Sequence, residues 1–172
     1  NTWVYMDVIA RLTSIDDDDL TDFDSILLPL NGPFGKQSTD IDPLMGCAAT
    51  LFPSIGRAAN LCRKVRTMKS NSIAIISQAI ELKEQIEQWQ VYTDLEDPED
   101  PSCEIQHALQ TAEAYRYATL LYLHQAVPEI PSLTSAQLAQ MVLKYLATVP
   151  LSSRVVIVQI YPLLAAGCEA YD

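Results

Sequence analysis

One run of apolar residues restricts the fold of this chain more than any other feature. Six of them recur at positions i, i+3, i+4, i+7, i+8 and i+11: Leu138, Met141, Val142, Tyr145, Leu146 and Val149. Side chains alternate between the two faces of a strand, so no strand could bury this set on one face, whereas an α-helix gathers it on one side. The preceding residues 134–137 (TSAQ) have the pattern of a capping box, which predicts that the helix begins there.

Similar patterns predict helices at about residues 3–12, 47–68, 73–89, 104–127 and 154–171. Pro53 should kink or restart the second of them. The last is ambiguous, because residues 155–158 (VVIV) favour a strand by propensity while their length and neighbours favour a buried helix, which we choose. We therefore predict an all-α fold, a bundle of about six helices in antiparallel pairs. Residues 14–46 and 93–103, acidic or rich in proline, are expected to be two long loops.

Length and charge limit the classes of function. A chain of 172 residues favours a single domain over residues 1–172, and its first residue, Asn1, suggests a fragment of a longer protein. With 22 acidic and 11 basic residues the net charge is -11, so direct binding to nucleic acid is not expected. Residues 1–46 and 93–131 each sum to -7, residues 47–92 to +3 and residues 132–172 to zero. The longest apolar stretch is shorter than the roughly 20 residues that cross a bilayer, so no membrane contact is expected.

Residues suited to catalysis or to metal binding are scarce. The two histidines, His107 and His124, leave little material for acid–base catalysis. Cys103 and His107 stand one helical turn apart, but they would supply only half of a structural zinc site. We predict that the chain is not an enzyme and that it contains no catalytic residue, metal or cofactor. Cys62 lies beside basic residues that could lower its pKa, but its place in an apolar series favours a packed, unreactive thiol.

One charged residue interrupts the apolar part of the predicted helix at residues 104–127. Arg116 stands between two tyrosines in that stretch, where a buried guanidinium needs a hydrogen-bonding or acidic partner. Glu113 is too close in sequence to face it squarely. The partner that we expect is Glu169, in a structural ion pair with Arg116.

Two segments resemble a known family: residues 112–123 (AEAYRYATLLYL) and residues 160–170 (IYPLLAAGCEA). Together with residues 3–12 and 47–62, they are similar in order and spacing to the fungal-specific transcription factor domain. That domain is the regulatory region of zinc binuclear cluster transcription factors, here of the branch that includes sterol-responsive regulators. Tyr161 stands where the family usually has tryptophan, which keeps the aromatic character.

The resemblance implies a helical regulatory domain of a nuclear protein, acting through ligand sensing, dimerisation or contact with coregulator proteins. The six-cysteine cluster that binds DNA is absent here, because the four cysteines are scattered, so zinc and DNA binding belong outside this chain. For a sensor we predict an apolar pocket for a hydrophobic small molecule, lined by Tyr117, Leu121, Met141 and Tyr145. The alternatives are a dimerisation or scaffold module without a ligand, motivated by the apolar residues 155–171, or a small helical enzyme.

Overall fold

The computed structural model describes residues 2–13, 46–68, 70–91 and 103–169. These residues form six α-helices and one short 3₁₀ helix, with no strand among them, so the all-α prediction is confirmed. The elements are α1 (Thr2–Thr13), α3 (Phe52–Arg66), α4 (Ile73–Gln88), α5 (Cys103–Ala126), α6 (Ser135–Ala147), the 3₁₀ helix η1 (Arg154–Val158) and α7 (Ile160–Gly167). The two expected loops lie outside the described residues, except for Gly46 and for Cys103, which begins α5.

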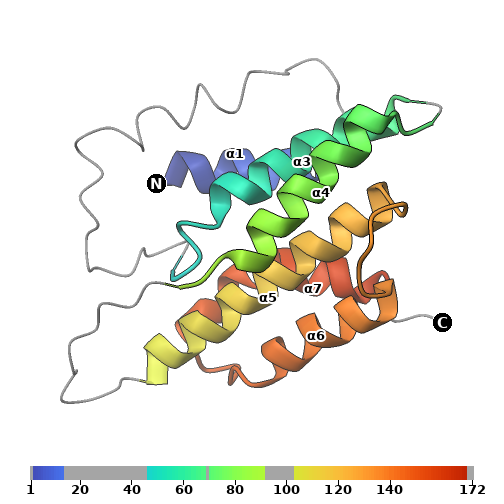
Figure 1. Cartoon of the computed structure of the whole chain (residues 1–172). Coiled ribbons are helices and arrows are strands. Elements are labelled where there is room, and N and C mark those ends of the chain that lie inside the picture. The colour runs from blue at the N-terminus through green and yellow to red at the C-terminus, as the bar shows by residue number, and fades with distance from the viewer. Residues whose placement is uncertain (1, 14–45, 69, 92–102, 170–172) are drawn as a thin grey trace.

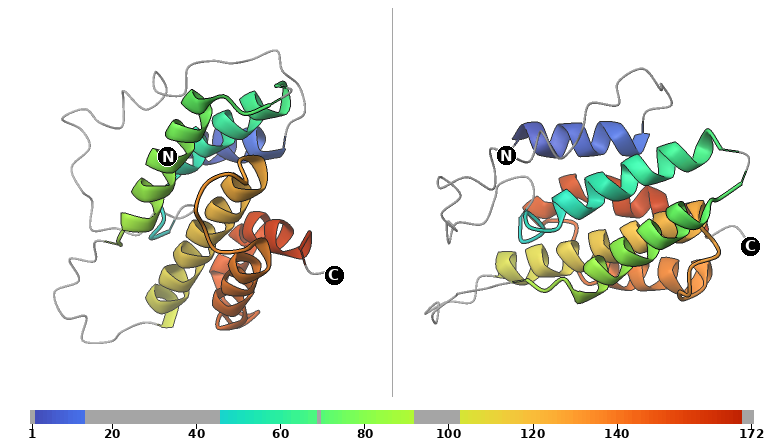
Figure 2. Two further views of the ribbon diagram at one scale, coloured as in Figure 1. Left: turned by 45° about the vertical axis from the view of Figure 1, so that its right-hand side comes forward. Right: turned by 45° about the horizontal axis from the view of Figure 1, so that its top comes forward.

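Helix α5 is the centre of the fold. It contacts α3 and α4 on one side and α6, η1 and α7 on the other (Figure 1). The ribbons of α3 and α4 run antiparallel, as do those of α5 and α6 and those of α6 and α7, while α1 packs against α3 (Figures 1 and 2). This arrangement gives the antiparallel helical pairs that the sequence predicts.

Two helix starts follow directly from local sequence. α3 begins at Phe52 with Pro53 in its first turn, where a helix has no use for the N–H that proline lacks. The expected interruption near Pro53 is therefore a helix start. α6 begins with the predicted capping box, because the Thr134 hydroxyl accepts from the Gln137 N–H at 3.3 Å and the Gln137 side chain accepts from the Thr134 N–H at 3.1 Å.

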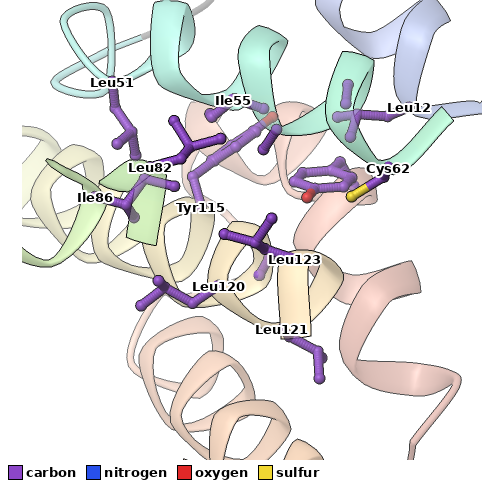
Figure 3. Packing of buried hydrophobic residues seen from close by; sticks show 14 of the residues in the cluster. Leu12, Leu51, Ile55, Cys62, Leu82, Ile86, Tyr115, Leu120, Leu121 and Leu123 are labelled. Atoms are coloured by element: carbon purple, nitrogen blue, oxygen red, sulfur yellow. The ribbon is translucent and has the colours of Figure 1, made fainter. Parts of the chain in front are cut away.

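Four aromatic rings form a row across the bundle, one from each of α1, α3, α5 and α7. Successive ring centroids of Tyr5, Phe52, Tyr115 and Tyr161 lie 5.6, 5.5 and 5.7 Å apart, in tilted contacts. Such contacts contribute about 0.5–1.5 kcal/mol each beyond the burial of their area. We call these four residues the aromatic row. Apolar side chains of α3, α4 and α5 lie around Tyr115 (Figure 3).

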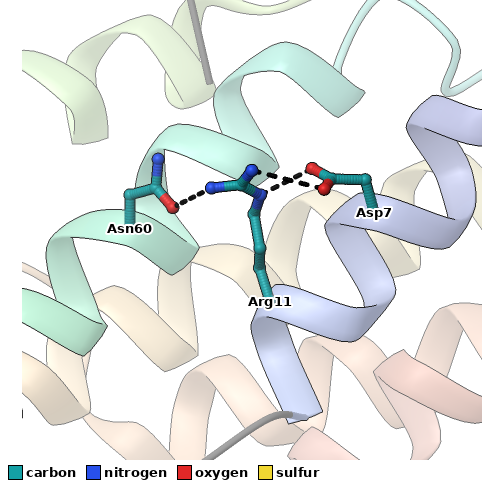
Figure 4. A network of polar contacts seen from close by, with 3 residues as sticks. All are labelled: Asp7, Arg11 and Asn60. Carbon is teal, nitrogen blue, oxygen red and sulfur yellow. Dashed lines mark hydrogen bonds and ion pairs between the residues drawn. The ribbon is translucent and has the colours of Figure 1, made fainter. Parts of the chain in front are cut away.

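A buried arginine joins α1 to α3. Arg11, only 4% exposed, pairs with Asp7 on its own helix through Nε and Oδ2 at 2.5 Å, and its Nη1 donates to Asn60 Oδ1 at 2.9 Å (Figure 4). A buried guanidinium is tolerated only when charge and hydrogen bonds compensate it. These partners from α1 and α3 provide that compensation.

Candidate functional site

The last helical segment differs from the expected continuous helix over residues 154–171. It is divided at Gln159 into η1 and α7, which ends at Gly167. Residues 155–158 are all β-branched, which lowers their helix propensity. Pro162 has no N–H to donate to the carbonyl of Val158 four residues earlier, so an α-helix cannot continue through both.

Two buried hydrogen bonds from α5 hold this break in place. The Tyr115 hydroxyl donates to the Val158 carbonyl oxygen at 2.5 Å, which gives that carbonyl the partner that Pro162 cannot supply. The Gln159 side chain, 9% exposed, donates through Nε2 to Thr111 Oγ1 at 2.9 Å. Below them the ring of Tyr161 packs on that of Tyr115. The inner side of η1 and α7 is therefore fixed by specific bonds as well as by apolar contact.

The outer side of the same segment is apolar and open to solvent. Ile157, Ile160, Leu163 and Leu164 are 74%, 62%, 54% and 59% exposed. Ile160 and Leu164 stand one helical turn apart with Leu163 beside them, so the three share one side of α7, and Ile157 precedes Ile160 by three residues. We call these four residues the α7 apolar face. Contiguous exposed apolar side chains are typical of surfaces that contact other molecules.

Charged residues stand only at the ends of this segment within the described part of the chain. Arg154 of η1 and Glu104 of α5 are 89% and 61% exposed at their side chains and lie 3.6 Å apart. Beyond α7, Glu169 accepts a hydrogen bond from the side chain of Gln125 at 2.5 Å. The α7 apolar face itself contains no charge.

The four residues predicted to line a ligand pocket lie on α5 and α6. The rings of Tyr117 and Tyr145 stack on each other with centroids 5.6 Å apart. Leu121, one turn further along α5, is fully buried, and Met141, one turn back along α6, is half-buried. Because α5 and α6 are antiparallel, the four residues share one interhelical seam. Binding of a ligand there stays a prediction.

The expected ion pair between Arg116 and Glu169 is wrong. Arg116 instead pairs with Glu113, Nη2 to Oε2 at 2.9 Å, and its guanidinium lies 4.9 Å from the centroid of the Tyr117 ring. Residues three apart on a helix are neighbours, so Glu113 is well placed. Glu169 lies instead against Gln125, nine residues from Arg116 and so about 13 Å along α5. Arg116 also donates to the carbonyl oxygen of Glu87 in the last turn of α4, which favours a cation.

The remaining candidates for chemistry are Cys62, His107 and His124. Burial raises the pKa of the Cys62 thiol to about 12 against a smaller lowering by Arg66, and its Sγ donates to the Tyr122 carbonyl oxygen at 3.7 Å. The prediction that Cys62 is packed in the core is confirmed. His107 Nδ1 lies 3.1 Å from Ser153 Oγ, and His124 stands in the last turn of α5.

Among the described residues no three His, Cys, Asp or Glu side chains gather as metal ligands, and none of the helices is long and apolar enough to cross a membrane.

The model of a family described as the fungal specific transcription factor domain matches residues 1–172. No curated protein and no solved structure matches the chain.

Proposed function

This chain belongs to the family of fungal specific transcription factor domains and so has a regulatory role in a fungal transcription factor, and we propose that it acts through direct contact with another protein. The contact surface is the α7 apolar face. Membership of the family implies a nuclear protein. The chain would then regulate transcription because another protein packs against its apolar surface. DNA binding belongs to a part of the transcription factor outside this chain.

The exposed area of the α7 apolar face supports a contact of moderate strength. Its four side chains together expose the equivalent of about two and a half fully exposed residues. Covering them completely would contribute roughly 4–7 kcal/mol, at about 1.5–3 kcal/mol per fully buried side chain. Association itself costs about 4–15 kcal/mol in lost freedom. These four residues alone would therefore bind a partner weakly, and contacts made by the residues around them must add to the binding free energy, as suits a reversible regulatory contact.

The hydrogen bonds beneath the face support the same proposal. The Tyr115–Val158 and Gln159–Thr111 bonds fix the backbone of η1 and the start of α7 before any partner arrives. A surface that is already ordered loses less conformational entropy on binding. The single observation that carries the proposal is this combination: a segment fixed by buried polar bonds on its inner side and presenting four exposed apolar side chains on its outer side.

A reporter assay tests the proposal. The chain is fused to an unrelated DNA-binding domain, and transcription from a reporter with the matching site is compared with that of the DNA-binding domain alone. We expect Leu164→Glu to weaken the effect of the chain on transcription about tenfold, equivalent to ~1.4 kcal/mol of contact free energy. Ile160→Glu should act in the same direction.

Ile73→Glu is the matched control, because Ile73 is an equally apolar residue that is 84% exposed on α4. It should leave the reporter unchanged, and circular dichroism with thermal melting should show that all three variants remain folded. A folded Leu164→Glu variant with full effect on the reporter would contradict the proposal.

A further inference from the structure

We propose that α1 controls how well the α7 apolar face is ordered, with Tyr5 as the positioning residue that acts through Tyr115. While α1 is docked on α3, the aromatic row holds the inner side of η1 and α7 in place, and release of α1 leaves these two helices less ordered. The inference rests on the proposed function, since it names a control of the same surface.

The first helix is attached to the bundle mainly from one side. It packs against α3, whereas the central helix α5 has neighbours on both of its sides. Among the described residues of α1, the buried apolar side chains are Val4, Val8 and Leu12. An element with few buried apolar contacts opens at a lower free energy than the core of a protein does. Release of α1 therefore leaves α3 and α5 folded.

The polar attachment of α1 is specific in position. Arg11 is bonded to Asp7 of its own helix and to Asn60 of α3. A buried ion pair recovers little more than the hydration that its charges lose on burial, so these bonds add little to the strength of docking. The bond to Asn60 fixes where α1 lies along α3, and in that position Tyr5 packs on Phe52. The attachment suits a helix that docks reversibly in one register.

Tyr5 connects this helix to the break between η1 and α7. Its ring is half-buried and begins the aromatic row, in which Phe52 and Tyr115 are 0% and 2% exposed. Burial raises the pKa of Tyr115, and the side chain of Tyr5, which reaches the Tyr115 hydroxyl, raises it further. The same hydroxyl donates to the Val158 carbonyl oxygen. A single buried hydroxyl therefore contacts both α1 and the end of η1.

Loss of Tyr5 from the row acts on the α7 apolar face by two routes. It removes one of the two rings that pack on Phe52, and it removes a neighbour that holds the Tyr115 hydroxyl in position. Chains of packed side chains and hydrogen bonds of this kind carry coupling between distant sites. A less ordered η1 and α7 lose more conformational entropy when a partner binds. By linkage, whatever holds α1 in place strengthens binding at the α7 apolar face.

Hydrogen–deuterium exchange of the 172-residue chain, followed by mass spectrometry, tests the coupling. We expect Tyr5→Ala to speed amide exchange in η1 and α7 about fivefold through more frequent local opening, and to leave exchange in α4 unchanged. Met6→Ala is the matched control, because Met6 lies on the same helix and is 60% exposed. It should leave exchange in η1 and α7 unchanged. Equal acceleration in α4, η1 and α7, or no acceleration in η1 and α7, would overturn the inference.

A double-mutant cycle tests the route through Tyr115. Tyr5→Phe keeps the ring and removes only the hydroxyl, so the variant should fold and should speed exchange in η1 and α7 about twofold. In a chain that already carries Tyr115→Phe, the same change should have no further effect, because the hydroxyl through which Tyr5 acts is gone. Independent effects of the two changes would overturn the role of Tyr5, and this cycle decides the question even if Tyr5→Ala does not fold.

The reporter assay separates this inference from the proposed function. Tyr5→Ala should weaken the effect of the chain on transcription, as Leu164→Glu does, although Tyr5 lies on another helix, and Met6→Ala should leave it unchanged. If Tyr5→Ala speeds exchange in η1 and α7 while Leu164→Glu leaves the reporter unchanged, the coupling stands and the proposed regulatory role of the face is wrong. If the reporter responds to Leu164→Glu but not to Tyr5→Ala, the face keeps its role and control by α1 is wrong.

Discussion

Replacement of Tyr115 by phenylalanine tests how the end of η1 is held. The variant keeps the ring in the aromatic row and removes only the hydroxyl, which donates to the Val158 carbonyl oxygen at 2.5 Å. Pro162 cannot replace this donor because it has no N–H. The variant thus loses the hydrogen bond to Val158, together with the contact of that hydroxyl with Tyr5, and leaves a buried carbonyl without its donor.

The loss of the Tyr115–Val158 hydrogen bond sets the expected change in the free energy of unfolding. Loss of a hydrogen bond that leaves a buried group unsatisfied costs about 1–3 kcal/mol, so we expect Tyr115→Phe to lower the free energy of unfolding by ~2 kcal/mol. For a chain of this length that corresponds to a fall in Tm of roughly 4–8 °C. Urea denaturation followed by circular dichroism gives the free energy directly.

Tyr161→Phe is the matched control. Its ring lies in the same aromatic row, but its buried hydroxyl makes no hydrogen bond within the described residues. Burial of an unpaired hydroxyl is unfavourable, so its removal should change the free energy of unfolding by less than about 0.5 kcal/mol or should stabilise the protein. Equal losses in the two variants would refute the role assigned to the Tyr115–Val158 bond.

Two further predictions concern buried polar groups. Burial raises the pKa of Cys62 from 9.0 to about 12, so the unfolded chain loses this proton first and the free energy of unfolding should fall as pH rises above 9, by roughly 1 kcal/mol near pH 10. Urea denaturation at several pH values should show a shallower fall for Cys62→Ala, and an unchanged slope would contradict the assignment. Asp7→Ala removes the ion-pair partner of Arg11 and should lower the free energy of unfolding by roughly 1–3 kcal/mol, less than for a fully buried pair because the Asp7 side chain is 31% exposed. Replacement of both residues by apolar ones of similar size should cost less than Asp7→Ala alone. An equal or larger loss of stability in the double variant would count against this interpretation.

Local sequence rules predict the helices of this chain well. The periodic apolar residues of α4 and α6 and the capping box at Thr134 give those elements nearly at their observed bounds. The same rules also account for two of the differences between expectation and structure. Spacing of three residues makes Glu113 a neighbour of Arg116, and the missing N–H of Pro162 explains the break near Val158.

Contacts between distant segments could not be predicted in this way. The bond between Tyr115 and Val158 joins residues 43 apart, and it depends on how α5 packs against η1. Residues 155–171 are apolar on all sides, which is typical of a buried helix, so the sequence does not distinguish the inner side from the exposed α7 apolar face. Thr111 and Gln159 carry no signal of their own before the fold brings them together.

The aromatic row also determines how far this protein can be shortened without losing its fold. A shortened chain that starts after residue 13 would lack Tyr5 and would open one side of Phe52 to water, although both lie far in sequence from the C-terminal segment. Phe52 contacts Tyr115, and Tyr115 in turn contacts Tyr161 and binds Val158. Truncation at the amino terminus would therefore loosen η1 and α7 at the opposite end of the polypeptide. Deletion mapping would then wrongly assign to α1 a loss of function that originates in α7.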